Sequence, residues 1–141
     1  MLPGRAPGLR VRGHRGHPEV RRAVIRFARW LRTIRRFPTV LPIYLLSSER
    51  VRTLDGKLAS ASFFAPSSLA SAPYIRIATG DYPRLKRTWG RDNALAAYLC
   101  SVAHELVHYD QWDAGSDLTE RGVARRASDL VDRYAREVDR P

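Results

Sequence analysis

The apolar run from Ala94 to Val107 constrains the fold of this chain more than any other feature of the sequence. Its apolar side chains recur at helical spacing and form an unusually wide stripe, made by Leu95, Tyr98, Leu99, Val102, Ala103, Leu106 and Val107. A helix with so wide an apolar face must be covered on several sides. We therefore expect a central, well-buried helix that is capped near Asp92 and broken by Gly115.

The sequence before this helix changes from helical to extended spacing. Apolar side chains at three- and four-residue steps predict an amphipathic helix that begins at Pro18 and ends before Pro38. Short strands are then predicted at 40–46, 51–54, 58–64 and 74–79, the middle two forming a hairpin at Asp55-Gly56.

A further helix is expected from about Leu118 to Glu137, after the break at Gly115. The resulting order of helix, strands, helix and helix predicts an α+β fold. A chain of 141 residues is close to the usual size of one domain.

Residues 1–17 contain several prolines and glycines and no apolar period, which predicts a flexible basic tail followed by a single domain at 18–141. Deletion of this tail is expected to leave the fold intact. His14 and His17 lie within it, and we expect both to be solvated. Cys100 cannot form an internal disulfide and is expected to be a small buried thiol.

The formal net charge of +11 is concentrated in the first quarter of the chain. Residues 1–36 contain 11 arginines and one acid, Glu19, and so carry +10. This asymmetry favours binding of nucleic acid or another polyanion by residues 1–36. An alternative is codon bias without any binding role, because the chain has 23 arginines and 2 lysines.

No apolar run approaches the length of a membrane span, and no secretory signal is visible. We therefore expect a soluble protein in the cytoplasm, without a membrane partner.

The sequence His104-Glu105-Leu106-Val107-His108 lies on the predicted central helix. A four-residue step turns both imidazoles to the same side of a helix, within reach of one ion. Neutral imidazole is a good zinc ligand, and zinc lowers the pKa of its bound water towards neutrality. Glu105 is then expected to accept a proton from that water as it attacks a carbonyl, so zinc is the predicted cofactor.

This motif, with a helix break after it and a later glutamate, resembles the gluzincin branch of the zincin metallopeptidases. The resemblance covers Val102 to about Ala127, while residues 19–101 are similar only in layout. It implies a compact zincin-like fold, in which an N-terminal helix and a small mixed sheet precede the active-site helix and a C-terminal helix follows. It also implies a peptide or protein substrate.

In that branch a later glutamate is the third metal ligand, and Glu120 matches it best. Two other interpretations stay open. Asp117 and Glu120 also fit a capping box at the start of the last helix, and Asp117 or Asp113 could replace Glu120 as ligand. The chain departs from the branch in having Asp110 where an apolar residue is usual and Ala124 where an acidic residue often supports the ligands.

Zincins hold an extended peptide along an edge strand, and Tyr74 to Thr79 is our candidate for that strand. Tyr134, Tyr109 and Tyr82 are candidates for stabilising an oxyanion, and the sequence does not choose among them. The predicted function is zinc-dependent peptide hydrolysis. The alternatives are a nucleic-acid-associated zinc protein and a structural or regulatory metal site without turnover.

Overall fold

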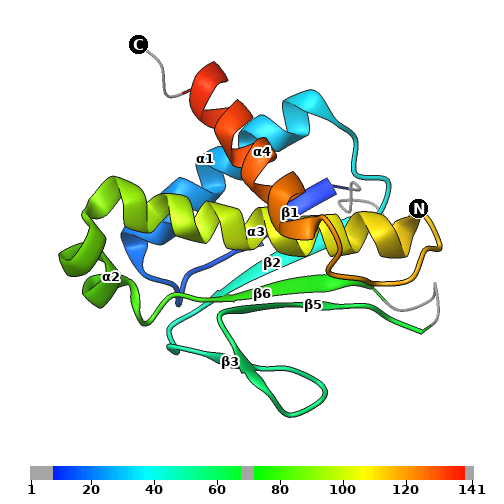
Figure 1. The fold of residues 1–141 in the computed structure, drawn as a ribbon, viewed down its shortest axis with the longest axis horizontal. Coiled ribbons are helices and arrows are strands. Elements are labelled where there is room, and N and C mark those ends of the chain that lie inside the picture. Colours follow the sequence, from blue (N-terminus) through cyan, green and yellow to red (C-terminus); the bar gives the residue numbers. More distant parts are fainter. Residues whose placement is uncertain (1–7, 68–71, 139–141) are drawn as a thin grey trace.

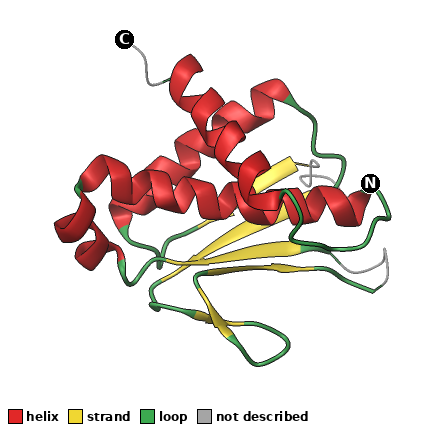
Figure 2. Cartoon of the chain, viewed as in Figure 1, coloured by secondary structure: helices red, strands yellow, loops and turns green. Residues whose placement is uncertain are grey.

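The computed structural model describes residues 8–67 and 72–138. The helices pack on one face of a twisted sheet, and a small hairpin lies beyond the other face (Figure 1). Figure 2 shows the same two layers coloured by secondary structure. This mixed architecture of helices and a small sheet is compatible with the predicted α+β class.

The elements follow one another as β1 (Gly8–Arg12), α1 (Pro18–Ile34), β2 (Val40–Leu46), β3 (Val51–Arg52), β4 (Leu58–Ala59), β5 (Ala61–Phe64), β6 (Tyr74–Ala78), α2 (Tyr82–Trp89), α3 (Arg91–Asp113) and α4 (Val123–Glu137).

The main sheet has the strand order β1-β2-β6-β5. β1, β2 and β6 run parallel, and β5 is antiparallel to β6. The expectation that the strand at Tyr74–Thr79 is an edge strand is therefore wrong, because β6 is paired on both sides. The edge strand beside α3 is β5.

The predicted hairpin at Asp55-Gly56 is confirmed, since β3 and β4 pair antiparallel around that turn. The single strand predicted at 58–64 is divided at Ser60. Leu58 and Ala59 belong to the hairpin, whereas Ala61–Phe64 turn back to pair with β6. This division places β5 in the main sheet and leaves the hairpin beside it.

The prediction of a flexible tail at residues 1–17 is wrong for residues 8–17, and residues 1–7 lie outside the described part. Residues 8–12 form β1, which pairs with β2, and Leu9 is 2% exposed in the core. Gly13 and Gly16 allow the chain to lie against Leu45, since an added Cβ would come within 2.8 and 2.7 Å of that side chain. Gly13 and Gly16 are therefore close-packing positions rather than breakers.

His17, expected to be solvated, has a structural role at the start of α1. Its Nδ1 accepts a hydrogen bond from the Glu19 N–H at 3.2 Å, and its ring packs against Tyr82. The backbone N–H of His17 donates a hydrogen bond to the side-chain hydroxyl of Thr79, just after β6. The segment before α1 is thereby fixed to the main sheet.

α3 is the central helix, as predicted, and contacts α1, α2, α4, β5 and β6. It begins at Arg91 with Gly90 as its cap, so the cap predicted at Asp92 is slightly misplaced. The separate short helix α2 was not predicted; Tyr82 in its first turn is fully buried.

Asp110 lies near the end of α3, where the zincin branch usually has an apolar residue. Its carboxylate forms a bidentate ion pair with the guanidinium of Arg35, with N–O distances of 2.6 and 2.9 Å. Arg35 directly follows α1, so this pair joins the ends of α1 and α3. The hydrogen bonds to Asp110 raise the pKa of the Arg35 guanidinium. The acid at this position is explained by its partner.

Within the described ranges 8–67 and 72–138, no helix combines the length and the apolar character that crossing a membrane requires.

The burial of β1 predicts that Leu9→Ala will destabilise the protein. Removing a buried leucine side chain costs about 2 to 5 kcal/mol, through lost transfer free energy and the cavity left behind. Arg12→Ala, at an exposed position on the same strand, is the matched control and is expected to change stability by less than about 0.5 kcal/mol. Urea unfolding measures both. Equal stability of the Leu9 variant and wild type would show that β1 is not part of the core.

Candidate metal centre

His104 and His108 lie one turn apart on α3, and their ring centroids are 5.1 Å apart. Their side chains are 34% and 12% exposed, so both can reach a ligand from the surface. The predicted convergence of the two imidazoles is present.

Glu120 reaches both imidazoles from the loop between α3 and α4. Its Oε1 is 2.9 Å from Nε2 of His104, and its Oε2 is 2.9 Å from Nε2 of His108. A carboxylate accepts hydrogen bonds and cannot donate them. These contacts therefore require either a hydrogen on each facing ring nitrogen or a cation bound between the rings and the carboxylate.

The capping interpretation of Glu120 is wrong. α4 begins at Val123 with Gly122 as its cap, so neither Asp117 nor Glu120 is in a first helical turn, and the predicted start near Leu118 is misplaced. Within residues 8–67 and 72–138, no hydrogen bond joins Asp113 or Asp117 to either histidine. Among the acids considered, Glu120 is the one in contact with the rings.

The hydrogen bonds of Glu120 stabilise its charged form. Partial burial opposes ionisation, but the hydrogen bond with His104 and the charges of the two rings outweigh it and lower the pKa of the carboxyl. The side chain is nevertheless 68% exposed. A charged, accessible oxygen of this kind is a suitable metal donor.

Glu105 lies beside the histidines and is 7% exposed. Its Oε2 is buried and has no hydrogen-bond partner among the described residues. Burial raises the pKa of this carboxyl, while positive charge on His104 and His108 opposes the rise. A carboxyl with a raised pKa is a better proton acceptor than a solvated one. Donor atoms of Glu105 and the two histidines all lie within 4.8 Å of one another.

Gln111 is a residue of the site that was not predicted from the sequence. In the structure its Oε1 is 2.9 Å from Nδ1 of His108. The i+3 spacing from His108 on a helix was the available signal, because residues at that spacing are neighbours.

A cleft of about 550 Å³ opens onto the candidate metal centre between the hairpin, the free edge of β5 and the loop after α3. Glu105, His108 and Glu120 line it at one side. The rest of its lining is largely apolar and includes Leu54, Leu58, Phe63, Phe64, Tyr74 and Leu118. Because residues from both faces of β5 contribute, the cleft follows the unpaired edge of that strand.

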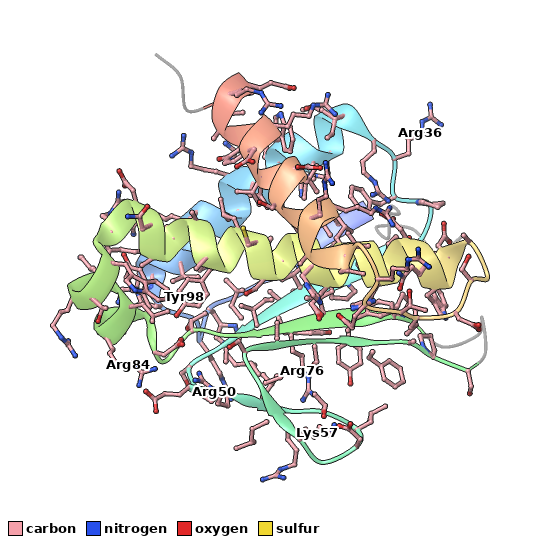
Figure 3. The ribbon with its side chains drawn as sticks, viewed as in Figure 1. Arg36, Arg50, Lys57, Arg76, Arg84 and Tyr98 are labelled. Carbon is pink, nitrogen blue, oxygen red and sulfur yellow. The ribbon has the colours of Figure 1, made fainter. Side chains whose placement is uncertain are left out.

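Arg76 joins the sheet to the hairpin at the floor of this cleft. Its guanidinium donates to the carbonyl oxygen of Arg52 at 2.6 Å and to the hydroxyl of Ser62 at 3.3 Å. Figure 3 shows Arg76 between β6 and the hairpin, with Lys57 farther along the hairpin. Both side chains line the cleft, and Lys57 pairs there with Asp55.

A second, smaller cleft of about 290 Å³ lies on the other side of Glu105. Cys100, Ser101 and His104 line it together with Ala61 of β5. Cys100 is thus half-buried rather than buried as expected, and burial raises the pKa of its thiol. The two clefts share Glu105 and Ala61, so open space extends along β5 on both sides of the metal centre.

None of the three tyrosines considered for an oxyanion role is among the residues that line either cleft. Tyr134 packs against Phe27 and Trp30, and Tyr109 shares a hydrogen bond with Thr39. Tyr82 is fully buried beside His17. Tyr74 is the tyrosine that lines the larger cleft.

Comparisons of the chain with protein-family models, with curated proteins and with solved structures find no match.

The donor set fits zinc. Two imidazole nitrogens and one carboxylate leave a coordination position free, and three protein ligands with one open position are typical of catalytic zinc sites. The unpartnered oxygen of Glu105 lies on the same side as the donors. His104, His108 and Glu120 are therefore the residues that would hold the ion.

Glu120→Gln is expected to weaken zinc binding by at least tenfold while leaving the metal-free protein as stable as wild type. The amide keeps the shape of the side chain but loses the anionic oxygen that zinc requires. Chelator competition measures the affinity, and melting in excess chelator measures the stability. Asp113→Asn and Asp117→Asn are matched controls with the same loss of charge. A larger loss of affinity in either control than in Glu120→Gln would move the third ligand to that aspartate.

Proposed function

We propose that this protein is a zinc-dependent peptidase with a compact, gluzincin-like zincin fold. The observation that carries the proposal is the meeting of His104 and His108 with Glu120, beside the buried carboxyl of Glu105. The order of α1, a small mixed sheet, α3 and α4 is compatible with that fold.

The proposed site consists of three metal ligands and one general base. His104, His108 and Glu120 would hold the ion, and zinc bound there would supply the Lewis acidity that acidifies water and polarises a carbonyl. Glu105 accepts a proton from the attacking water and is placed to return it to the leaving amine. Its burial excludes bulk water from the carboxyl, which supports this role.

The clefts support a peptide as substrate. β5 has an unpaired edge along open space on both sides of Glu105, and an extended chain can pair with such an edge. The larger cleft is apolar, so an apolar side chain next to the cleaved bond fits it best.

The proposal is tested by digestion of a peptide library with zinc-loaded wild type and Glu105→Gln. Glutamine keeps the shape but lacks a basic oxygen, so zinc content and melting temperature should be unchanged while hydrolysis falls at least about 100-fold. His104→Ala and His108→Ala should lose both zinc and hydrolysis.

Undiminished turnover by Glu105→Gln would exclude that residue as the base. Zinc binding without hydrolysis of any library peptide would support a structural or regulatory metal site in place of the peptidase.

A second candidate function, binding of nucleic acid, is favoured by the position of β1 beside α1. Arg10 and Arg12 of β1 and Arg32 of α1 line a groove of about 470 Å³. Arg21 and Arg29 are further exposed arginines on α1, whereas Arg22 and Arg26 line a separate groove together with Glu19 and Asp92. These guanidinium groups make a basic surface, for which the phosphate backbone is a suitable partner.

This candidate predicts binding of duplex DNA or RNA that weakens steeply as salt rises. The triple variant Arg12→Gln, Arg21→Gln and Arg29→Gln should bind more weakly and reduce the slope of log affinity against log salt by about 0.9 per lost phosphate contact. A triple variant at Arg87, Arg125 and Arg126, on α2 and α4, makes the same change in charge and is the control. Equal binding by both variants would assign the affinity to net charge alone.

A further inference from the structure

Gln111 contacts both His108 and the loop that carries Glu120. It lies on α3, three residues after His108, and is partly buried. Its Oε1 is 2.9 Å from Nδ1 of His108 and accepts the Thr119 N–H at 3.2 Å. Its Nε2 donates to the carbonyl oxygen of Thr119 at 3.1 Å. One amide side chain thus pairs with an imidazole and with both backbone polar groups of one residue.

The backbone of Thr119 fixes the orientation of the Gln111 amide. An N–H needs an acceptor and a carbonyl needs a donor, so Oε1 must face the Thr119 N–H and Nε2 the Thr119 carbonyl. Oε1 also faces Nδ1 of His108, and an oxygen acceptor there requires a hydrogen on Nδ1. The neutral ring then carries its lone pair on Nε2, the atom that faces Glu120.

The same amide holds the backbone immediately before Glu120. Glu120 precedes α4, where its carbonyl oxygen accepts a turn hydrogen bond from the Val123 N–H at 3.2 Å, and its side chain is 68% exposed. The two hydrogen bonds between Gln111 and Thr119 attach this loop to α3 at the adjacent residue. Without these two hydrogen bonds, the loop would be less restrained in the metal-free protein. Binding of the metal would then have to order the Glu120 carboxylate.

We propose that Gln111 is a positioning residue that sets the tautomer of His108 and the location of Glu120 together. Partners of this kind typically change metal affinity by 10- to 100-fold when they are removed. The inference rests on the proposed zinc site for its effect on metal affinity, but its effect on the loop does not depend on metal.

The test replaces Gln111 with methionine, which is similar in length and cannot make these hydrogen bonds. Chelator competition should show zinc affinity reduced by roughly 10-fold or more. In metal-free protein, amide hydrogen exchange at Thr119 should become faster, because its N–H loses its acceptor. Asn93→Met, at the other end of α3, is the matched control, since among the described residues the Asn93 amide hydrogen-bonds to the carbonyl oxygen of Trp89 in α2.

Gln111→Glu provides a rescue variant. Its carboxylate keeps the acceptor for His108 and for the Thr119 N–H but loses the donor to the Thr119 carbonyl. Zinc affinity is expected to lie between that of wild type and that of Gln111→Met.

Unchanged zinc affinity in Gln111→Met, or unchanged exchange at Thr119, would overturn the inference while leaving the peptidase proposal intact. Failure of wild type to bind zinc would overturn the proposed function. The exchange comparison in metal-free protein would then support or overturn the attachment of the loop by itself.

Discussion

The burial of α3 on nearly all of its sides is the constraint on which the rest of the structure depends. The helix packs against α1, α2, α4 and the strands β5 and β6, which leaves little of its surface open. His104 and His108 occupy part of the open surface, between β5 and the loop that carries Glu120. Because the helix is fixed from so many directions, the two rings have a rigid base, which a metal site needs if its ligands are to be placed before the ion binds.

The features that could be predicted from the sequence are those specified by local spacing. The apolar stripe on α3, the period of α1 and the Asp55-Gly56 turn each depend on neighbouring residues, and all are present. The convergence of His104 and His108 is of the same kind, since it follows from helix geometry alone.

The features that were missed depend on contacts between distant segments. Gly13 and Gly16 look like breakers in isolation, and their packing against Leu45 becomes visible only when β1 lies beside β2. The edge strand was misassigned because the division at Ser60, which sends Ala61–Phe64 back to the main sheet, has no clear signal in an apolar run.

Glu120 illustrates the same limit within the site. Asp117 and Glu120 have the spacing of a capping box, but the helix starts later, at Val123, and the glutamate is held beside the histidines instead. Tertiary contacts of the loop, including those of Thr119 with Gln111, override the local preference. Glu120, which was matched to a ligand only by resemblance, is thus the candidate residue whose position depends most on the fold.

X-ray absorption spectroscopy of the zinc-loaded protein tests the proposed ligand set most directly. We predict a first shell of nitrogen and oxygen atoms at about 2.0 to 2.2 Å, with the outer-shell scattering of two imidazole rings. The raised pKa of Cys100 disfavours the thiolate form that zinc binds, although this cysteine lines the cleft next to His104. A sulfur scatterer at about 2.3 Å, or a shell without imidazole scattering, would contradict the site built from His104, His108 and Glu120.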